Sequence, residues 1–129
     1  MNNLHIKERR VANVVVLDMD GSMRIGESGV VFQSTIRRLL EEGQRQILLN
    51  LAGIANIDSS GLGELIASHN VLRKNDGQVK LLHLTKRVRE LMVITKLLTV
   101  FDVYENEAEA LDSFRHPALK PAELQPALV

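Results

Sequence analysis

The sequence contains no cysteine and no tryptophan, and aromatic residues fill only 3% of its 129 positions. Without cysteine the chain cannot form a disulfide, a thiolate metal site or a cysteine nucleophile, which fits a reducing cytoplasm. Its 16 basic residues are balanced by 16 acidic ones, so no overall field attracts nucleic acid or an anionic membrane surface. We therefore expect partners that are recognised locally, with no nucleic acid among them.

Long apolar segments are also missing. Apolar runs such as residues 14–17 fall far short of the roughly 20 residues that a membrane-spanning helix needs. The N-terminus, MNNLHIKERR, lacks the apolar segment of a secretory signal peptide. Apolar residues still make up 45% of the chain, enough to bury the core of one domain. We expect a soluble, cytoplasmic protein without a membrane span.

Hydrophobic periodicity along the chain alternates between the strand and the helix patterns. Five strands are predicted, over residues 4–7, 14–20, 46–51, 79–84 and 100–104. Four helices are predicted: over residues 29–42, from just after the serines at 59 and 60 to the turn at 75–78, around the periodic positions 88–95, and from 106 to about 115. Gly43 and Asn106 stand where a helix C-cap and a helix N-cap are expected. This order predicts an α/β fold with a mixed sheet, an N-terminal edge strand, a central strand at 46–51, and helices on at least one face.

The C-terminal residues differ in composition from the rest. Three prolines interrupt HPALKPAELQPALV at 116–129, and each removes an amide donor and disfavours helix. We predict one domain over residues 1–115 and an extended or disordered tail over 116–129.

A polar segment, NIDSSGLGELI at 56–66, separates the central strand from the next helix. Loops at the carboxyl ends of parallel strands collect functional groups, and a helix N-terminus offers unpaired amides and partial positive charge. One interpretation is helix capping by Asp58, Ser59 or Ser60, worth about 1 kcal/mol. A capping box from Ser60 would need Glu or Gln three residues later, where Gly63 stands. Capping accounts for one polar residue and leaves the other two unexplained.

Catalytic and metal-binding motifs are not matched by this segment or by the histidines. Gly61-Leu62-Gly63 is not followed by the lysine of a phosphate-binding loop, and Ile66 holds the place of the third glycine of a dinucleotide fingerprint. Neither serine has the flanking glycines of a nucleophile elbow. The four histidines show no paired ligand spacing, and His69 is expected to be a partly buried packing residue. We predict no catalytic residue, no metal site and no cofactor.

The stretch ILLNLAGIANIDSSGLGELI, together with VKLLHLTKRVRELMVITKLLTVFDVYENEAEAL, resembles the STAS family, the domain shared by sulphate transporters and bacterial anti-sigma factor antagonists. The resemblance covers roughly residues 4–115, and its most specific part is Asp-Ser-Ser-Gly-Leu-Gly. It implies a single-domain STAS-like α/β fold, with a mixed sheet of about five strands packed with about four helices.

The resemblance also implies a regulatory function without catalytic activity. In the free-standing antagonists of this family, the serine directly after the aspartate, here Ser59, is phosphorylated by a histidine-kinase-like ATPase that is also the anti-sigma factor. We expect the unphosphorylated protein to sequester this kinase and phosphorylation to release it, because nearly two negative charges are added beside Asp58. A serine phosphatase that resets the switch and a homodimer are compatible with this scheme.

The neighbouring residues are predicted to form a partner-binding loop. Ser60 is expected to support the loop and cap the helix, and Asp58 to orient it or to assist recognition by the kinase. Gly61 and Gly63 either admit a partner close to the backbone or ease a tight turn. Leu62 is either an exposed contact or the first core residue of the helix.

The chain departs from the family pattern after the second strand. Free-standing antagonists often carry Gly, an acid, an apolar residue and Asp there, whereas this chain has Gly21-Ser22-Met23-Arg24. The arginine reverses the local charge and leaves partner identity and any nucleotide contact open. One alternative function is therefore a STAS scaffold subunit of a sensory assembly, or a regulator associated with a transporter.

A second alternative rests on VVVLDMDGS at 14–22, which imitates the first motif of haloacid dehalogenase-type phosphatases. In that case Asp18 would be the nucleophile and Asp20 the acid/base, with magnesium. No paired acids follow the later strands, so both aspartates are interpreted more simply as solvent-facing positions on an alternating strand.

Overall fold

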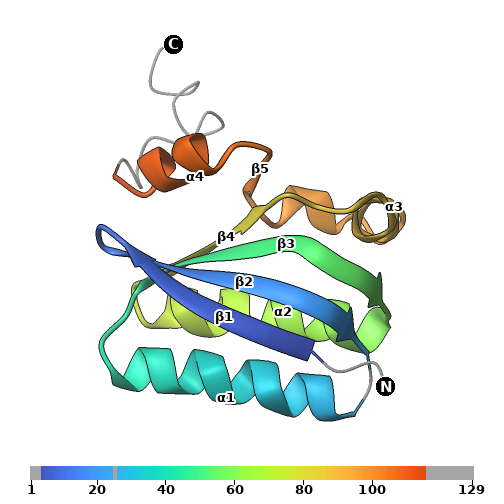
Figure 1. The fold of residues 1–129 in the computed structure, drawn as a ribbon, viewed down its shortest axis with the longest axis horizontal. Coiled ribbons are helices and arrows are strands. Elements are labelled where there is room, and N and C mark those ends of the chain that lie inside the picture. The colour runs from blue at the N-terminus through green and yellow to red at the C-terminus, as the bar shows by residue number, and fades with distance from the viewer. Residues whose placement is uncertain (1–3, 25, 116–129) are drawn as a thin grey trace.

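Five strands form one mixed sheet in the order β1-β2-β3-β4-β5 (Figure 1). The computed structural model describes residues 4–24 and 26–115. Within them the edge strand pairs antiparallel with its neighbour, and every other neighbouring pair is parallel. The strands are β1 (Leu4–Val11), β2 (Val14–Met23), β3 (Gln46–Ile57), β4 (Gln78–Leu82) and β5 (Val103–Tyr104). The predicted mixed sheet, edge strand and central strand are thereby confirmed.

The central strand is longer than its apolar run predicts. It continues from residue 51 to Ile57, because β2 extends equally far and remains paired with it. Irregular pairing interrupts the register between Asp18 and Asp20 and again between Gly21 and Ser22. Such irregularities break the strict alternation of inward and outward side chains, which hides this part of the strand from a periodicity test.

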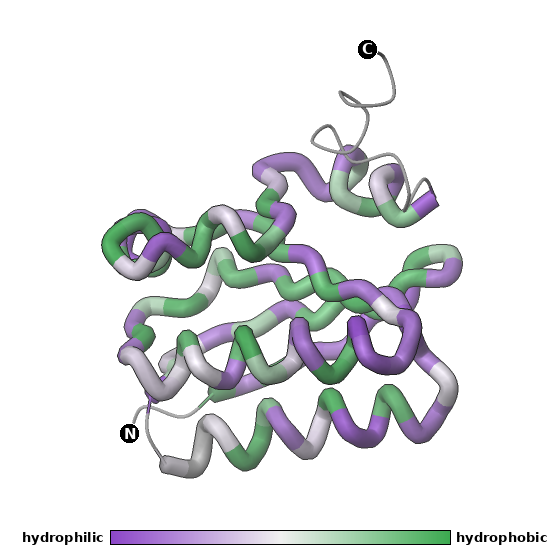
Figure 2. Tube along the Cα trace, turned by 180° about the vertical axis from the view of Figure 1, so that it is seen from behind, coloured by the Kyte–Doolittle hydropathy of each residue, from purple (hydrophilic) through white to green (hydrophobic). Residues whose placement is uncertain are grey.

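The helices cover both faces of the sheet. In Figure 1, α1 and α2 lie side by side on one face, α4 lies on the other, and α3 lies near the carboxyl end of β3. Figure 2 shows polar and apolar residues alternating along the turns of α1 and α2, as amphipathic helices require. The described helices are α1 (Glu27–Glu41), α2 (Ser59–Lys74), α3 (Lys86–Ile94) and α4 (Glu107–Ser113), with a short 3₁₀ helix at Leu97–Thr99.

Both predicted helix caps are present. Gly43 adopts φ +86° after α1 and donates its N–H to the carbonyl of Leu40 at 3.0 Å, while Gln44 donates to Leu39 at 2.9 Å. This pair of bonds closes the end of the helix in the manner typical of glycine. At the start of α4, the Asn106 side chain accepts the N–H of Glu109 at 3.0 Å.

Two hydrophobic cores lie on opposite faces of the sheet. Val15 and Leu17 of β2 point into the larger core beneath α1 and α2, whereas Val14 and Val16 point into a smaller core with Phe114 of α4. The continuous apolar run of β2 is explained by this burial on both sides.

No helix within residues 4–24 and 26–115 is long and apolar enough to cross a membrane. The tail predicted over 116–129 lies outside the described residues. The division into a domain at 1–115 and a tail remains a prediction.

Candidate functional site

The candidate site lies where β3 ends at Ile57 and α2 begins at Ser59. Asp58 between them has an extended backbone, and its carboxylate accepts the N–H of Gly61 at 3.0 Å. Its own N–H donates to the Met23 carbonyl at 3.2 Å, which ties the loop to the end of β2. The prediction that Ser60 caps the helix is therefore wrong. A cap residue needs the extended backbone that Asp58 has, and Ser60 already belongs to the helix.

Ser59 is the first residue of α2, and its side chain is exposed, whereas that of Ser60 is half-buried. The first N–H groups of a helix have no acceptor within the helix and carry partial positive charge. Ser59 is thus exposed to solvent at the positive end of α2. Ser60 shares the helix face of Glu64, four residues later, and the Glu64 carboxylate is hydrogen-bonded to Gln33 of α1.

The two glycines of the loop have different surroundings. A Cβ on Gly61 would lie 2.2 Å from the Met23 carbonyl oxygen and 2.8 Å from Cγ1 of Ile57. Gly61 therefore allows α2 to pack against the ends of β2 and β3, and its surroundings leave no room for a partner. A Cβ on Gly63 would have no atom within 4 Å, and this residue is exposed. Only Gly63 leaves an open surface for close approach.

Leu62 is only 3% exposed and belongs to the larger core. Of its two predicted roles, the structure supports the first core residue of α2. Gly61 and Leu62 are buried, so they cannot contribute to the surface of the predicted partner-binding loop. Its surface consists of Ser59 and Gly63, with Asp58 and Ser60 partly exposed.

The neighbouring end of α1 was not predicted to belong to the site. A Cβ on Gly29 would lie 3.0 Å from Oε2 of Glu64, so α1 and α2 approach closely beside the candidate site. The next residues, Val30 and Val31, are 68% and 41% exposed. The sequence could have indicated this exposed apolar pair, because both valines lie outside the helical stripe of Phe32 and Ile36 that faces the core.

The stretch that departs from the family pattern belongs to β2 up to Met23. Ser22 and Met23 are 3% and 1% exposed, so neither offers a contact at the surface. Arg24 directly after the strand is exposed. The changed charge therefore lies at the surface, next to Met23, whose carbonyl accepts the N–H of Asp58.

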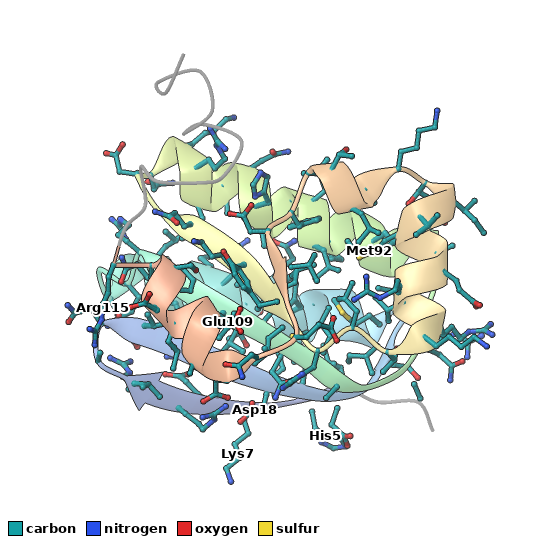
Figure 3. The ribbon with its side chains drawn as sticks, turned by 90° about the horizontal axis from the view of Figure 1, so that it is seen from above. His5, Lys7, Asp18, Met92, Glu109 and Arg115 are labelled. Atoms are coloured by element: carbon teal, nitrogen blue, oxygen red, sulfur yellow. The ribbon has the colours of Figure 1, made fainter. Side chains whose placement is uncertain are left out.

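Asp18 is held by hydrogen-bond donors in a manner unsuited to a nucleophile. Arg9 donates Nε–H to its Oδ2 at 2.6 Å and an Nη–H to its Oδ1 at 3.0 Å, and Asn50 donates to Oδ1 at 2.8 Å. The hydrogen bond from Arg9 lowers the pKa of Asp18. Arg9 also binds Glu107 of α4 at 2.8 Å, so the aspartate belongs to a structural ion-pair network that joins β1, β2 and α4. Figure 3 shows where Asp18 lies on the sheet.

The phosphatase alternative also assigns a role to Asp20 and needs a magnesium site. Asp20 is exposed as predicted, but no group of three or more His, Asp or Glu side chains in the described part of the chain could hold a metal ion. His69 packs edge-on against Phe101 with ring centroids 5.2 Å apart, which confirms its predicted packing role.

Comparison with known proteins agrees with the fold. The model of the STAS domain matches residues 5–110. An anti-sigma F factor antagonist of Paenibacillus polymyxa is 23% identical over 109 residues, which span 84% of this chain and 93% of that protein. The crystal structure of an anti-sigma factor antagonist from Mycobacterium paratuberculosis superposes with a TM-score of 0.75 at 20% identity, covering 87% of this chain and 94% of the other.

A further likeness is to the Bacillus cell fate determinant SpoIIAA in its phosphorylated form. The TM-score is 0.68 at 20% identity, covering 85% of this chain and 99% of that one. These structural likenesses show the fold, and the domain match spans most of the sequence. The chain belongs to the STAS domain family.

Proposed function

We propose that this protein is an anti-sigma factor antagonist, which binds an anti-sigma factor through the start of α2 and is released by phosphorylation of Ser59. The proposal is supported by relatives that are named as antagonists and by a related fold solved in a phosphorylated form. The observation that carries it is the exposed side chain of Ser59 at the first position of α2.

The position of Ser59 suits a reversible charge switch. A phosphate there would lie at the positive end of α2, where helix amides and the dipole tolerate a dianion. The Asp58 carboxylate already occupies the N–H of Gly61, so the added charge would stand beside an existing negative charge. The modification would thus leave α2 folded while changing what can dock on it.

Phosphorylation of Ser59 would strongly weaken binding of the partner. An interface fitted to a hydroxyl and to the bare backbone of Gly63 would meet added bulk, a desolvation cost and repulsion. A loss of about 3 kcal/mol in binding free energy raises the dissociation constant more than a hundredfold. In this scheme the partner is a histidine-kinase-like ATPase that is both kinase and anti-sigma factor, and a serine phosphatase restores the binding form. The chain itself contributes a substrate hydroxyl and a docking surface, and no catalytic group.

Ser59 and Ser60 differ in a way that favours one acceptor. Ser59 shares the exposed face of α2 with Gly63, whereas Ser60 shares the face that is turned toward α1. A kinase active site needs a hydroxyl that can enter it from solvent. Ser59 meets this need better.

The test is phosphorylation with ATP and the candidate kinase, read by mass spectrometry of the intact protein and its peptides. Wild type and Ser60→Ala should each gain one phosphate, and Ser59→Ala should gain none. Phosphate that survives Ser59→Ala and disappears in Ser60→Ala would contradict the assignment. Recovery of STAS paralogues without a kinase, in purification of the native complex, would favour the scaffold alternative.

A further inference from the structure

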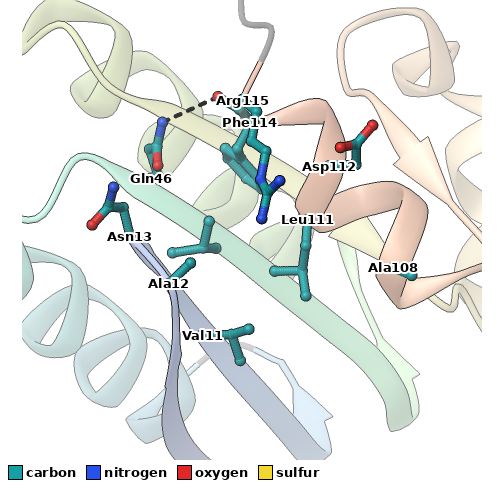
Figure 4. A pocket seen from close by; sticks show the side chains of 10 residues that line it. Val11, Ala12, Asn13, Gln46, Ala108, Leu111, Asp112, Phe114 and Arg115 are labelled. Atoms are coloured by element: carbon teal, nitrogen blue, oxygen red, sulfur yellow. Dashed lines mark hydrogen bonds between the residues drawn. The ribbon is translucent and has the colours of Figure 1, made fainter.

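A pocket lies at the end of the sheet opposite the candidate site, between the β1–β2 turn, the start of β3 and α4 (Figure 4). Its volume is about 380 Å³, near the lower limit of typical ligand-binding pockets. Its apolar part is formed by Val11, Val14, Leu111 and Phe114, and its polar part includes Asn13, Gln46, Asp112 and Arg115.

The point at which the chain leaves α4 is fixed at the rim of this pocket. The Gln46 side chain donates to the Phe114 carbonyl at 3.3 Å, as the dashed line in Figure 4 shows. Lys80, whose side chain is 3% exposed, donates to the hydroxyl and the carbonyl of Ser113 at 2.8 and 3.2 Å, and its Nζ lies 4.8 Å from the centre of the Phe114 ring. Arg115 lines the pocket itself. The residues that follow Arg115 therefore start at the pocket.

We propose that residues 116–129 of the same chain dock in this pocket. The segment carries leucines at 119, 124 and 128 and prolines at 117, 121 and 126. Proline supplies carbonyl acceptors but no N–H, so a proline-rich segment cannot satisfy its carbonyls by forming a regular helix. The carboxamides of Asn13 and Gln46 can donate to such carbonyls, and the apolar part of the pocket can receive leucine side chains. Lys120 and Glu123 also offer one charge of each sign to Asp112 and Arg115.

The covalent link makes weak intrinsic binding sufficient. A short tether raises the effective concentration of a docked segment to the millimolar range. A pocket with an intrinsic dissociation constant of about 1 mM would then be occupied roughly half of the time or more. The segment also has ample reach, at about 3 Å per residue. Because the pocket and Ser59 lie at opposite ends of the parallel strands, this proposal stands independently of the phosphorylation switch.

Paramagnetic labelling of the full-length protein tests the proposal directly. The chain has no cysteine, so Ala122→Cys creates a single attachment site for a nitroxide. Docking predicts loss of the amide signals of Asn13, Gln46 and Leu111, while the signal of Gly63 keeps its intensity. Reduction of the nitroxide should restore the lost signals.

Ala108→Arg, added to the labelled protein, is the matched control. Ala108 is exposed and lines the pocket, so the longer side chain should occupy the pocket and reduce the broadening of the three signals to what the covalent tether alone produces. Three outcomes would overturn the proposal. In the first, the pocket signals are unaffected in the protein without Ala108→Arg. In the second, they are broadened equally with and without Ala108→Arg. In the third, they are lost only through a nitroxide on a second, isotopically unlabelled copy of the chain.

Discussion

Gly61 and Gly63 lie two positions apart in α2, and the structure assigns them opposite roles. Gly61 closes against the Met23 carbonyl, whereas Gly63 faces open solvent. We expect Gly61→Ala to destabilise the fold by about 1–3 kcal/mol, since the added methyl overpacks the end of the sheet. Gly63→Ala should stabilise it by about 0.5–1 kcal/mol, because alanine is the better helix former.

Urea unfolding of the two variants beside wild type measures both effects. The paired design controls for the change in helix propensity, which is the same glycine-to-alanine change at both sites. A stabilised Gly61→Ala would show that the contact with β2 is not as close as the structure describes. A destabilised Gly63→Ala would show that this position is not open.

The residues at the start of α2 differ in how far their roles follow from local sequence. The spacing of the loop placed Ser59 correctly beside a helix start, because that feature is local. The identity of the cap was not decided by spacing, since Asp58, Ser59 and Ser60 all have suitable side chains. It was decided by the backbone of Asp58, which is held extended by a hydrogen bond to Met23 on another strand.

Among the elements, β1, β2 and α4 are joined by one ion-pair network. Arg9 of β1 binds Asp18 of β2 and Glu107 of α4, and its hydrogen bonds lower the pKa of both carboxyl groups. A carboxyl group with a lowered pKa in the folded state stabilises the fold above its unfolded pKa, which is about 4 for these side chains. This stabilisation is lost as the pH falls through the lowered folded values.

We therefore expect Arg9→Gln to lower the free energy of unfolding by about 1 kcal/mol near neutral pH, the scale of a partly exposed network. The difference from wild type should be smaller at about pH 2, because this stabilisation is lost as the pH falls below about 4 through the lowered pKa values of both carboxyl groups. Urea unfolding at the two pH values measures it. A difference that stays constant across this range would mean that Arg9 acts through packing of its stem and not through its charge.

At the same scale, the order of strands and helices was predictable because each has a distinct hydrophobic period. The full length of β3 was not, since its last residues pair with β2 across irregular register. The burial of Gly61 was equally hidden, because it depends on how α2 meets the end of β2, whereas burial of Leu62 was one of its two predicted roles. The network of Arg9 was missed for the same reason, as it joins segments that are distant in the sequence.

Across the whole molecule, the sheet separates two surfaces with different chemistry. The carboxyl ends of the parallel strands carry Ser59 and the open face of Gly63. The opposite ends carry the pocket that Phe114 and Arg115 help to line. Because the chain has no net charge, a phosphate on Ser59 would be a large change in the local field. Docking on the first surface could thus change without unfolding either core.

The central claim is best tested by calorimetric titration of the purified anti-sigma factor with this protein, before and after phosphorylation. We predict that the unmodified protein and Ser59→Ala bind with similar affinity, and that the protein phosphorylated at Ser59 binds at least about a hundredfold more weakly. Equal affinity of the phosphorylated and unmodified proteins would contradict the account.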